Sequence, residues 1–319
     1  GFSEYGFPES HAASFALLVY ASCWIKRHHP AEFLAAMLNS QPLGFYTPSQ
    51  LVQDARRHGV QVLPADVLAS DWDCTLQGMA ALPAVRLGLR MISGLARAVA
   101  ARIVAARGQG PFADAEDLAR RARLDEQDMR RLAGADALAS VCGHRRQQVW
   151  AASAVKATPR LLRDAPVRET FLELPAAPEG EEIVFDYAST GLTLRRHPLA
   201  LLRPLLRQRR LHNAQELRDL PDGSPVRCCG LVTLRQQPQT AEGVIFVSLE
   251  DETGVVQVIV YRQVRERQRA ALLHAKLLAV QGRWQREGDV GNVIAARLAD
   301  LTPLLGRLAE VTSRGRNFH

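Results

Sequence analysis

Apolar positions in the first eighty or so residues recur every three or four residues, which is the spacing of amphipathic helices. Residues 10–27 are predicted to form a buried helix. The residues on its inner stripe are Phe15, Leu18, Val19, Ser22 and Ile25. Pro30 fits the first turn of a second helix, and the segment 47–50 (TPSQ) has the form of a capping box that begins a third. Gly59 is the matching stop, and we expect a short strand over 60–63.

From Val85 onward the pattern changes to short, alanine-rich helices joined by tight glycine turns. The turn at 93–96 (SGLA) precedes one helix, Asp114 is predicted to cap the next, and the turn at 132–136 (LAGAD) leads into a last helix over 144–154. Two similar turns about forty residues apart in this sequence predict a tandem helix-hairpin-helix unit.

The C-terminal third is predicted to be rich in β structure. Residues 158–182 contain many Pro, Ala and Glu without periodicity and indicate a connector, and helical spacing resumes over 187–210. From Val226 five strands follow, with a helix over 262–274 between the third and the fourth, which is the order of an OB barrel. The fold class expected is therefore multidomain α + β: a helical segment, a tandem helix-hairpin-helix domain and a C-terminal OB-fold barrel.

Positive charge gathers in the predicted hairpin region. The formal net charge of the whole chain is +7, whereas residues 86–163 hold fifteen Lys or Arg against seven Asp or Glu. Such an excess attracts polyanions and favours salt-sensitive binding to phosphates. A solvated, arginine-rich surface without a ligand explains the same charge count, so charge alone leaves both interpretations open.

Composition excludes several other classes. The sequence has no run of eighteen or more apolar residues and no secretory signal pattern, so we expect a cytoplasmic protein. The five cysteines form no paired C-x-x-C motif, and His28 and His29 diverge on a helix without further ligands, which argues against a metal site. Cys228 and Cys229 are interpreted as small buried hydrophobes. The chain begins at Gly1 without an initiator Met, inside a segment typical of packed structure, so we expect a fragment of a longer protein.

Several segments, taken in order, resemble one family. The residues 1–40 (GFSEYGFPESHAASFALLVYASCWIKRHHPAEFLAAMLNS) resemble the end of the fingers of bacterial C-family DNA polymerases, the DNA polymerase III alpha-like enzymes. The likeness continues through 60–66, the two hairpins, the segment 189–199 (STGLTLRRHPL) and the barrel, so it covers nearly the whole chain. A shared order over that length is more specific than any single motif.

Other details resemble the error-prone translesion subfamily. Replicative alpha subunits have Asn-Lys where Pro8 and Glu9 stand here, and they carry a clamp-binding pentapeptide that has no match between Val149 and Glu182. They also continue into a further C-terminal domain, whereas this chain stops soon after the barrel. The segments that carry the subfamily resemblance are 8–11 (PESH), 41–60, 70–74 (SDWDC), 249–261 and 313–319.

The resemblance implies a division of the chain into five parts. They are the C-terminal part of the fingers (1–84), the tandem helix-hairpin-helix domain (85–157), a connector with a helical segment (158–224), the OB-fold domain (225–304) and a tail (305–319).

The resemblance also implies an activity for the intact protein: DNA-directed DNA polymerisation in translesion synthesis and damage-induced mutagenesis. The carboxylates that hold Mg²⁺ in the family lie in the palm, outside this chain, so we nominate no catalytic residue and expect the isolated chain to be inactive. The implied partners are primer-template DNA, deoxynucleoside triphosphates and accessory translesion proteins that include an inactive relative of Y-family polymerases, with clamp contact indirect. The alternatives are a replicative alpha subunit and, in another class, a non-catalytic DNA-binding or scaffold module.

The fingers motif and the first hairpin turn supply the candidate DNA contacts. Ser10 and His11 resemble residues that face the nucleotide, although a helix N-cap and a surface histidine explain them as well. A glycine turn brings the backbone close to a phosphate, and the N–H groups of the next helix can donate to it. The candidates around the first turn are Gly94, Leu95, Ala96, Arg97, Arg102 and Arg107. Asp136 opposes a phosphate at the second turn, which is therefore expected to be mainly structural.

The barrel offers further candidates for contacts with single-stranded DNA. We interpret Phe246 and Tyr261 as core residues and Trp284, between Arg283 and Arg286, as the better stacking platform. The basic residues expected to line a groove are Arg227, Arg235, Lys276, Arg283, Arg286 and Arg297. Ten basic and eight acidic residues nearly balance in this domain, so protein docking is the competing interpretation.

Overall fold

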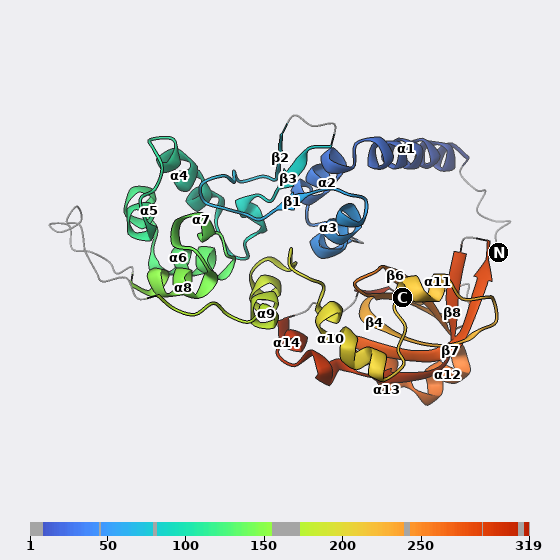
Figure 1. Cartoon of the computed structure of the whole chain (residues 1–319). Coiled ribbons are helices and arrows are strands. Elements are labelled where there is room, and N and C mark those ends of the chain that lie inside the picture. Colours follow the sequence, from blue (N-terminus) through green and yellow to red (C-terminus); the bar gives the residue numbers. More distant parts are fainter. Residues whose placement is uncertain are drawn as a thin grey trace. The chain divides into compact units, whose positions relative to one another are not determined.

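The computed structural model describes residues 9–44, 46–78, 82–154, 173–238, 243–288, 290–311 and 316–318. The chain divides into two compact units, Gly1–Ala176 and Ala177–His319, which are treated separately below (Figure 1). Within the described ranges no helix is long and apolar enough to cross a membrane.

The first unit begins with three helices. They are α1 (Glu9–His28), α2 (Pro30–Asn39) and α3 (Pro48–Arg57). The predicted capping box at the start of α3 is confirmed, because the Gln50 N–H donates to Thr47 Oγ1 at 3.3 Å and the Thr47 N–H donates to Gln50 Oε1 at 3.0 Å. The expected burial of α1 is wrong for the described chain: Phe15 is 53% exposed and Leu18 is 61% exposed, because no described segment covers that stripe.

A small sheet and a set of short helices complete the first unit. The predicted strand near residue 60 is confirmed as β1 (Val62–Leu63), which pairs in parallel with β3 (Ala84–Arg86), and β3 pairs antiparallel with β2 (Thr75–Gln77). The helices that follow are η1 (Leu89–Met91), α4 (Arg97–Arg107), α5 (Ala115–Ala122), α6 (Glu126–Gly134), α7 (Ala139–Cys142) and α8 (Arg145–Ala154).

Local caps and a shared apolar core explain these short helices. Asp114 accepts from the Asp117 N–H at 2.8 Å at the start of α5, as predicted, and Asp125 does the same for α6. Their inward faces place the completely buried side chains of Ile103, Leu118, Leu132 and Leu138 in the interior. The described chain thus contains the tandem hairpin region expected from the sequence.

The second unit opens with α9 (Glu179–Thr190), α10 (Pro198–Gln208) and α11 (Ala214–Arg218). The segment 189–199 joins the first two of these helices through its side chains. Thr193 Oγ1 donates to Asp186 Oδ2 at 2.6 Å, Arg195 donates to the same carboxylate at 2.9 Å, and His197 accepts from the Leu199 N–H at 3.2 Å. These side chains of the segment 189–199 therefore have a structural role.

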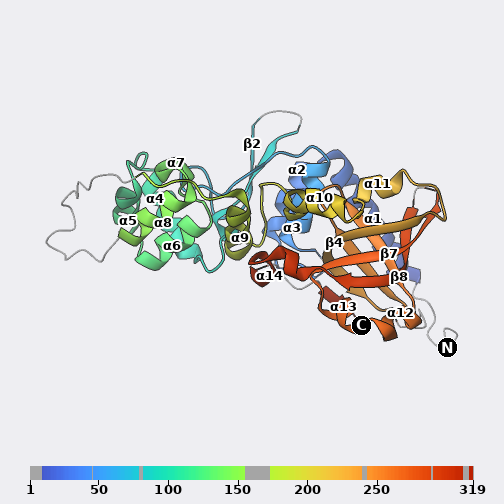
Figure 2. The same ribbon diagram turned by 60° about the horizontal axis from the view of Figure 1, so that its bottom comes forward.

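The barrel predicted from the strand order is confirmed. Its neighbours run β5-β6-β8-β7-β4, and an additional β4–β5 pairing closes it. Figure 2 labels three of these strands, β4, β7 and β8. The strands and their crossover helices are β4 (Pro225–Gln236), β5 (Ile245–Glu250), β6 (Val255–Val260), α12 (Arg262–Arg267), α13 (Arg269–His274), β7 (Leu277–Glu287) and β8 (Val290–Asp300). The elements after the barrel are η3 (Thr302–Leu305), α14 (Leu308–Val311) and β9 (Arg316–Phe318), which pairs with β4.

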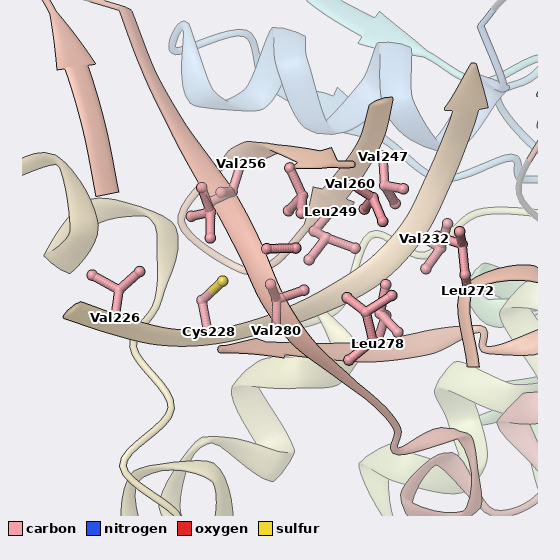
Figure 3. Packing of buried hydrophobic residues seen from close by; sticks show 14 of the residues in the cluster. Val226, Cys228, Val232, Val247, Leu249, Val256, Val260, Leu272, Leu278 and Val280 are labelled. Carbon is pink, nitrogen blue, oxygen red and sulfur yellow. The ribbon is translucent and has the colours of Figure 1, made fainter. Parts of the chain in front are cut away.

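The strand alternation of β4 divides its residues between two cores. Cys228 points into the barrel with Val226, Val247 and Val280 (Figure 3), whereas Cys229 packs outside it in a core that includes residues of α9, α10 and α14. Both thiols are buried, as expected, and burial raises the pKa of Cys229 to about 12. Cys23, by contrast, is exposed.

Candidate nucleic-acid interface

The first hairpin turn, residues 93–96 and called here the Gly94 turn, is open to solvent. Gly94 has φ +75°, a conformation that suits glycine, and it is exposed together with Ser93 and Ala96. Leu95 is the anchor: its side chain is buried and its N–H donates to the Ile92 carbonyl at 3.2 Å. The turn therefore presents backbone at the surface while one apolar side chain fixes it to the core.

Helix α4 begins directly after this turn with unused donors. Ala96 occupies the N-cap and supplies no side-chain hydrogen bond. Among the described residues, neither the Arg97 nor the Ala98 N–H donates a hydrogen bond. Free amides at a helix start and the helix dipole together favour an anion such as a phosphate.

Two guanidinium groups add positive charge beside the turn. Arg97 is exposed and has no ion pair within the described ranges. Arg131 comes from α6, and its Nε would lie 3.2 Å from a Cβ placed on Gly94. Its only recorded carboxylate neighbour in the described part of the chain is Asp128, at 3.5 Å. Sequence reasoning missed Arg131, because nothing in the linear pattern shows that α6 returns to the first turn.

The guanidiniums of Arg102 and Arg107 donate to backbone carbonyls of the chain itself. Arg102 Nε donates to the Ala122 carbonyl at 2.8 Å, and Arg107 NH1 donates to the Ser70 carbonyl at 2.8 Å. Arg107 also pairs with Asp71 at 2.7 Å. Their predicted contact with DNA stays a prediction, but the geometry gives both residues a structural task, which leaves Arg97 and Arg131 as the better-placed cations.

The second turn has different chemistry. Asp136 takes the left-handed conformation with φ +61°, and its Oδ1 accepts from Gln148 Nε2 at 2.6 Å. Its other oxygen lies 3.8 Å from Arg145, which is buried. A carboxylate engaged from α8 in this way ties the turn to the last helix, which supports the interpretation of this turn as structural.

His11 lies on the first turns of α1, where its ring packs 4.4 Å from that of Phe15, and it is exposed. Ser10 is part of the same helix, and its side chain lies outside the described residues. Their proximity to a nucleotide stays a prediction.

Two of the barrel candidates are buried. Arg235 is 6% exposed, and its Nε donates to the Leu272 carbonyl at 2.6 Å, so it fixes the end of α13. Burial also lowers the pKa of its guanidinium. Trp284 is 3% exposed and belongs to the barrel core, whereas Tyr261 is 50% exposed. The expected assignment of Trp284 as the surface platform and Tyr261 as core is therefore reversed. The alternation Arg283-Trp284-Gln285 was the signal that the tryptophan faces inward.

Three other basic residues form an exposed surface on the barrel, called here the arginine face (Arg227, Arg283 and Arg297). Gln281 of β7 stands opposite Arg227 of β4 on one side and Arg297 of β8 on the other, so the three lie in one row across the strands. Arg283 follows two residues after Gln281 on the same exposed side of β7. Within the described part of the chain these three arginines have no carboxylate partner, in contrast to Arg203, which pairs with Glu252 at 2.5 Å.

The other two basic candidates are held by backbone oxygens. Arg286 Nε donates to the Gly288 carbonyl at 3.0 Å and remains exposed. Lys276 Nζ donates to the Ala309 carbonyl. The described residues contain no group of three or more His, Cys, Asp or Glu side chains that could hold a metal ion.

Known families match both the hairpin region and the barrel. A family described as "Helix-hairpin-helix motif" matches residues 59–148, and one described as "OB-fold nucleic acid binding domain" matches residues 226–300. An "Error-prone DNA polymerase" of Bordetella parapertussis (strain 12822 / ATCC BAA-587 / NCTC 13253) is 55% identical over 324 residues, which cover 100% of this chain and 31% of that protein. Another, from Azoarcus sp. (strain BH72), is 55% identical over 325 residues, covering 100% of this chain and 30% of the relative.

The chain thus spans about 30% of the length of the curated relatives it matches. Among solved structures, that of asparaginyl-tRNA synthetase from Pyrococcus horikoshii complexed with asparaginyl-adenylate is 23% identical, with a TM-score of 0.25. That match covers 28% of this chain and 22% of the other.

Proposed function

The chain is homologous along its whole length to error-prone DNA polymerases, and on this premise we propose that it holds DNA for a DNA-directed DNA polymerase that copies damaged template. The names of the relatives favour this branch over a replicative alpha subunit. The observation that carries the DNA-holding role is the exposed Gly94 turn, with unused amides at the start of α4 and two cations beside it.

The Gly94 turn fits the backbone of duplex DNA. A phosphate placed against the turn accepts hydrogen bonds from the Arg97 and Ala98 N–H groups and lies beside the Arg97 and Arg131 guanidiniums. Such contacts act on the phosphate alone, so they position the duplex without reading its sequence. A polymerase that extends any primer needs this kind of grip.

The arginine face fits single-stranded template. Arg227, Gln281 and Arg297 form a row across three strands, and a strand laid along them meets guanidiniums that have no recorded carboxylate partner in the described residues. Guanidiniums bind phosphate and also stack on bases, which makes them suitable for a ligand of variable sequence. Docking of an accessory protein on this face is the competing role.

Polymerisation belongs to the whole enzyme in this proposal. The carboxylates that bind Mg²⁺ and the deoxynucleoside triphosphate lie outside these residues, and the described side chains supply no ligand set for the metal. The partners proposed beyond DNA are accessory translesion proteins that include an inactive Y-family relative, with indirect access to the clamp. The compartment proposed is the cytoplasm.

A binding titration tests the DNA-holding role. The chain is mixed with a fluorescent primer-template duplex at several salt concentrations, and anisotropy is measured for the wild type, Arg97→Ala and the control Arg56→Ala. Arg56 is an exposed arginine of α3 without an ion pair in the described ranges. Loss of one phosphate contact should make the negative slope of log K against log salt shallower by about 0.9, and only in Arg97→Ala. Absence of duplex binding by the wild type, or equal slopes in all three proteins, would refute the proposal.

A further inference from the structure

A pocket of about 480 Å³ opens at the end of the barrel where α11 and the β5–β6 and β7–β8 turns meet, and we call it the barrel-end pocket. Arg218 of α11, Val255 of β6, and Trp284 and Arg286 of β7 contribute to its lining, together with Val290 and Gly291 at the start of β8. All of these belong to the second unit. The arginine face lies on the outer side of the strands, so the pocket is a separate place on the same domain.

The floor of the pocket is set by a tryptophan and a glycine. A Cβ on Gly291 would come within 2.1 Å of the Trp284 ring, so only glycine lets the indole occupy this position. The indole Nε1 is buried and has no hydrogen-bond partner among the described residues. A buried donor of this kind is uncommon in a folded protein and indicates that an acceptor, from water or from a ligand, belongs in this region.

Two arginines, Arg218 and Arg286, contribute to the rim of the pocket. Arg286 NH1 donates to the Arg218 carbonyl at 3.2 Å, and the Arg218 guanidinium lies 3.0 Å from where a Cβ would stand on Gly254. Neither guanidinium pairs with a carboxylate in the described part of the chain. The nearby carboxylate of Asp222 accepts from the backbone N–H of Arg286 at 2.9 Å, and Asp289 lies outside the described residues. Two guanidiniums at one rim are suited to a phosphate.

Aliphatic side chains also contribute to the lining of the pocket. Val255 is 38% exposed and Val290 is 63% exposed, and both belong to the lining. The aliphatic side chains at the entrance suit a flat, weakly polar group of a ligand. The arginines at the rim suit an anionic group of the same ligand. The pocket volume falls within the range of about 300–1,000 Å³ that is usual for small-ligand sites, which accommodates one nucleotide.

We propose that the barrel-end pocket receives one unpaired nucleotide of single-stranded DNA. Its phosphate lies between Arg218 and Arg286, and its base lies against Val255 and Val290. A base inside a duplex is paired and stacked, so only an unpaired one enters. This inference rests on the proposed DNA-holding function and deepens it, because it gives the barrel a way to distinguish single-stranded template from duplex.

Fluorine NMR of the chain labelled with fluorotryptophan tests this directly. The chain has four tryptophans, so Trp284 gives one resonance, assigned by its loss in Trp284→Phe, and the other three serve as internal controls. The probes are thymidine monophosphate, inorganic phosphate and a thymidine oligonucleotide of about twelve residues, within the site sizes of OB folds. The mononucleotide and the oligonucleotide should each shift the Trp284 resonance, whereas inorganic phosphate at the same concentration should not.

Two variants locate the site, and one acts as a control. Arg218→Ala removes an exposed cation and Val290→Glu places a negative charge at the entrance. Both should abolish the Trp284 shift and weaken oligonucleotide binding at least about threefold, as expected for the loss of one charged contact. Arg262→Ala, whose exposed guanidinium already pairs with Glu266 at 2.8 Å, should leave the Trp284 shift intact.

Different outcomes test the nucleotide pocket and the proposed DNA-holding function on which it rests. Wild-type binding of the oligonucleotide with no movement of Trp284, or with equal affinity in both pocket variants, overturns the pocket while the DNA-holding function stands. A shift by inorganic phosphate alone overturns the nucleotide assignment, and a shift by the mononucleotide but not by the oligonucleotide shows a site for free nucleotides instead. Absence of any DNA binding overturns the proposed function itself.

Discussion

The backbone of Gly94 lies against the guanidinium of Arg131: a Cβ on the glycine would stand 3.2 Å from Nε of the arginine. The first residue shapes the turn before α4 and the second belongs to α6. Their contact brings a cation from the second hairpin to the exposed turn of the first, so the proposed phosphate site is built from both hairpins.

Replacement of Gly94 by alanine should lower the stability of the folded chain. The native φ of +75° disfavours an L side chain, and the new Cβ would press on Arg131, so we expect a loss of about 1–2 kcal/mol in the free energy of unfolding. Urea denaturation followed by circular dichroism measures it. Gly108→Ala is the matched control, because Gly108 has an ordinary helical φ of −61°. A Gly94→Ala protein as stable as the wild type would contradict the strain described here.

Replacement of Arg107 by alanine should lower stability without changing the electrostatics of DNA binding. Its guanidinium donates to carbonyls of Val67 and Ser70 and pairs with Asp71, so its loss leaves those acceptors unpaired. We expect the free energy of unfolding to fall by about 1–3 kcal/mol. The salt slope for duplex binding should remain that of the wild type. A lower slope with unchanged stability would instead make Arg107 a DNA contact.

Simultaneous replacement of Arg227 and Arg297 by alanine should weaken binding to single-stranded DNA. Both are exposed and stand on either side of Gln281, so each can contact a different phosphate of one strand. Each lost contact should reduce the salt slope by about 0.7. Anisotropy with a single-stranded oligonucleotide measures the effect. Arg262→Ala is the control, because Glu266 already pairs with Arg262 at 2.8 Å, and an equal effect there would argue against a specific role for the face.

Replacement of Glu252 by glutamine should change how stability depends on pH. The ion pair with Arg203 lowers the pKa of Glu252 in the folded chain, against the opposing effect of burial. A carboxyl whose folded pKa is lowered stabilises the fold above its unfolded pKa, and that stability is lost as the pH falls through the folded value. The wild type should therefore be more stable than the variant at neutral pH.

Urea denaturation at a series of pH values checks this expectation. The difference between the two proteins should shrink as the pH falls below the ordinary glutamate value of 4.5. A difference that stays constant down to acid pH would show that the loss comes from packing rather than from the charge of Glu252.

The sequence by itself determined the local elements, because their signals lie within a few residues of one another. Thr47 and Gln50 form the capping box that their spacing predicted, Asp114 caps its helix, and the strand order closes the barrel. These features depend on backbone hydrogen bonds and on apolar periodicity, both of which can be read along the chain.

Only the tertiary structure decided which of the similar side chains remain available. Arg97 and Arg107 begin and end the same helix, yet one is exposed and the other is bound to the carbonyls of a segment far away in sequence. Trp284 stands between polar neighbours but is buried, while Tyr261 is exposed. Availability depends on which distant backbone groups and side chains a residue meets after folding, and those partners are set by packing and strand register rather than by neighbouring residues in the chain.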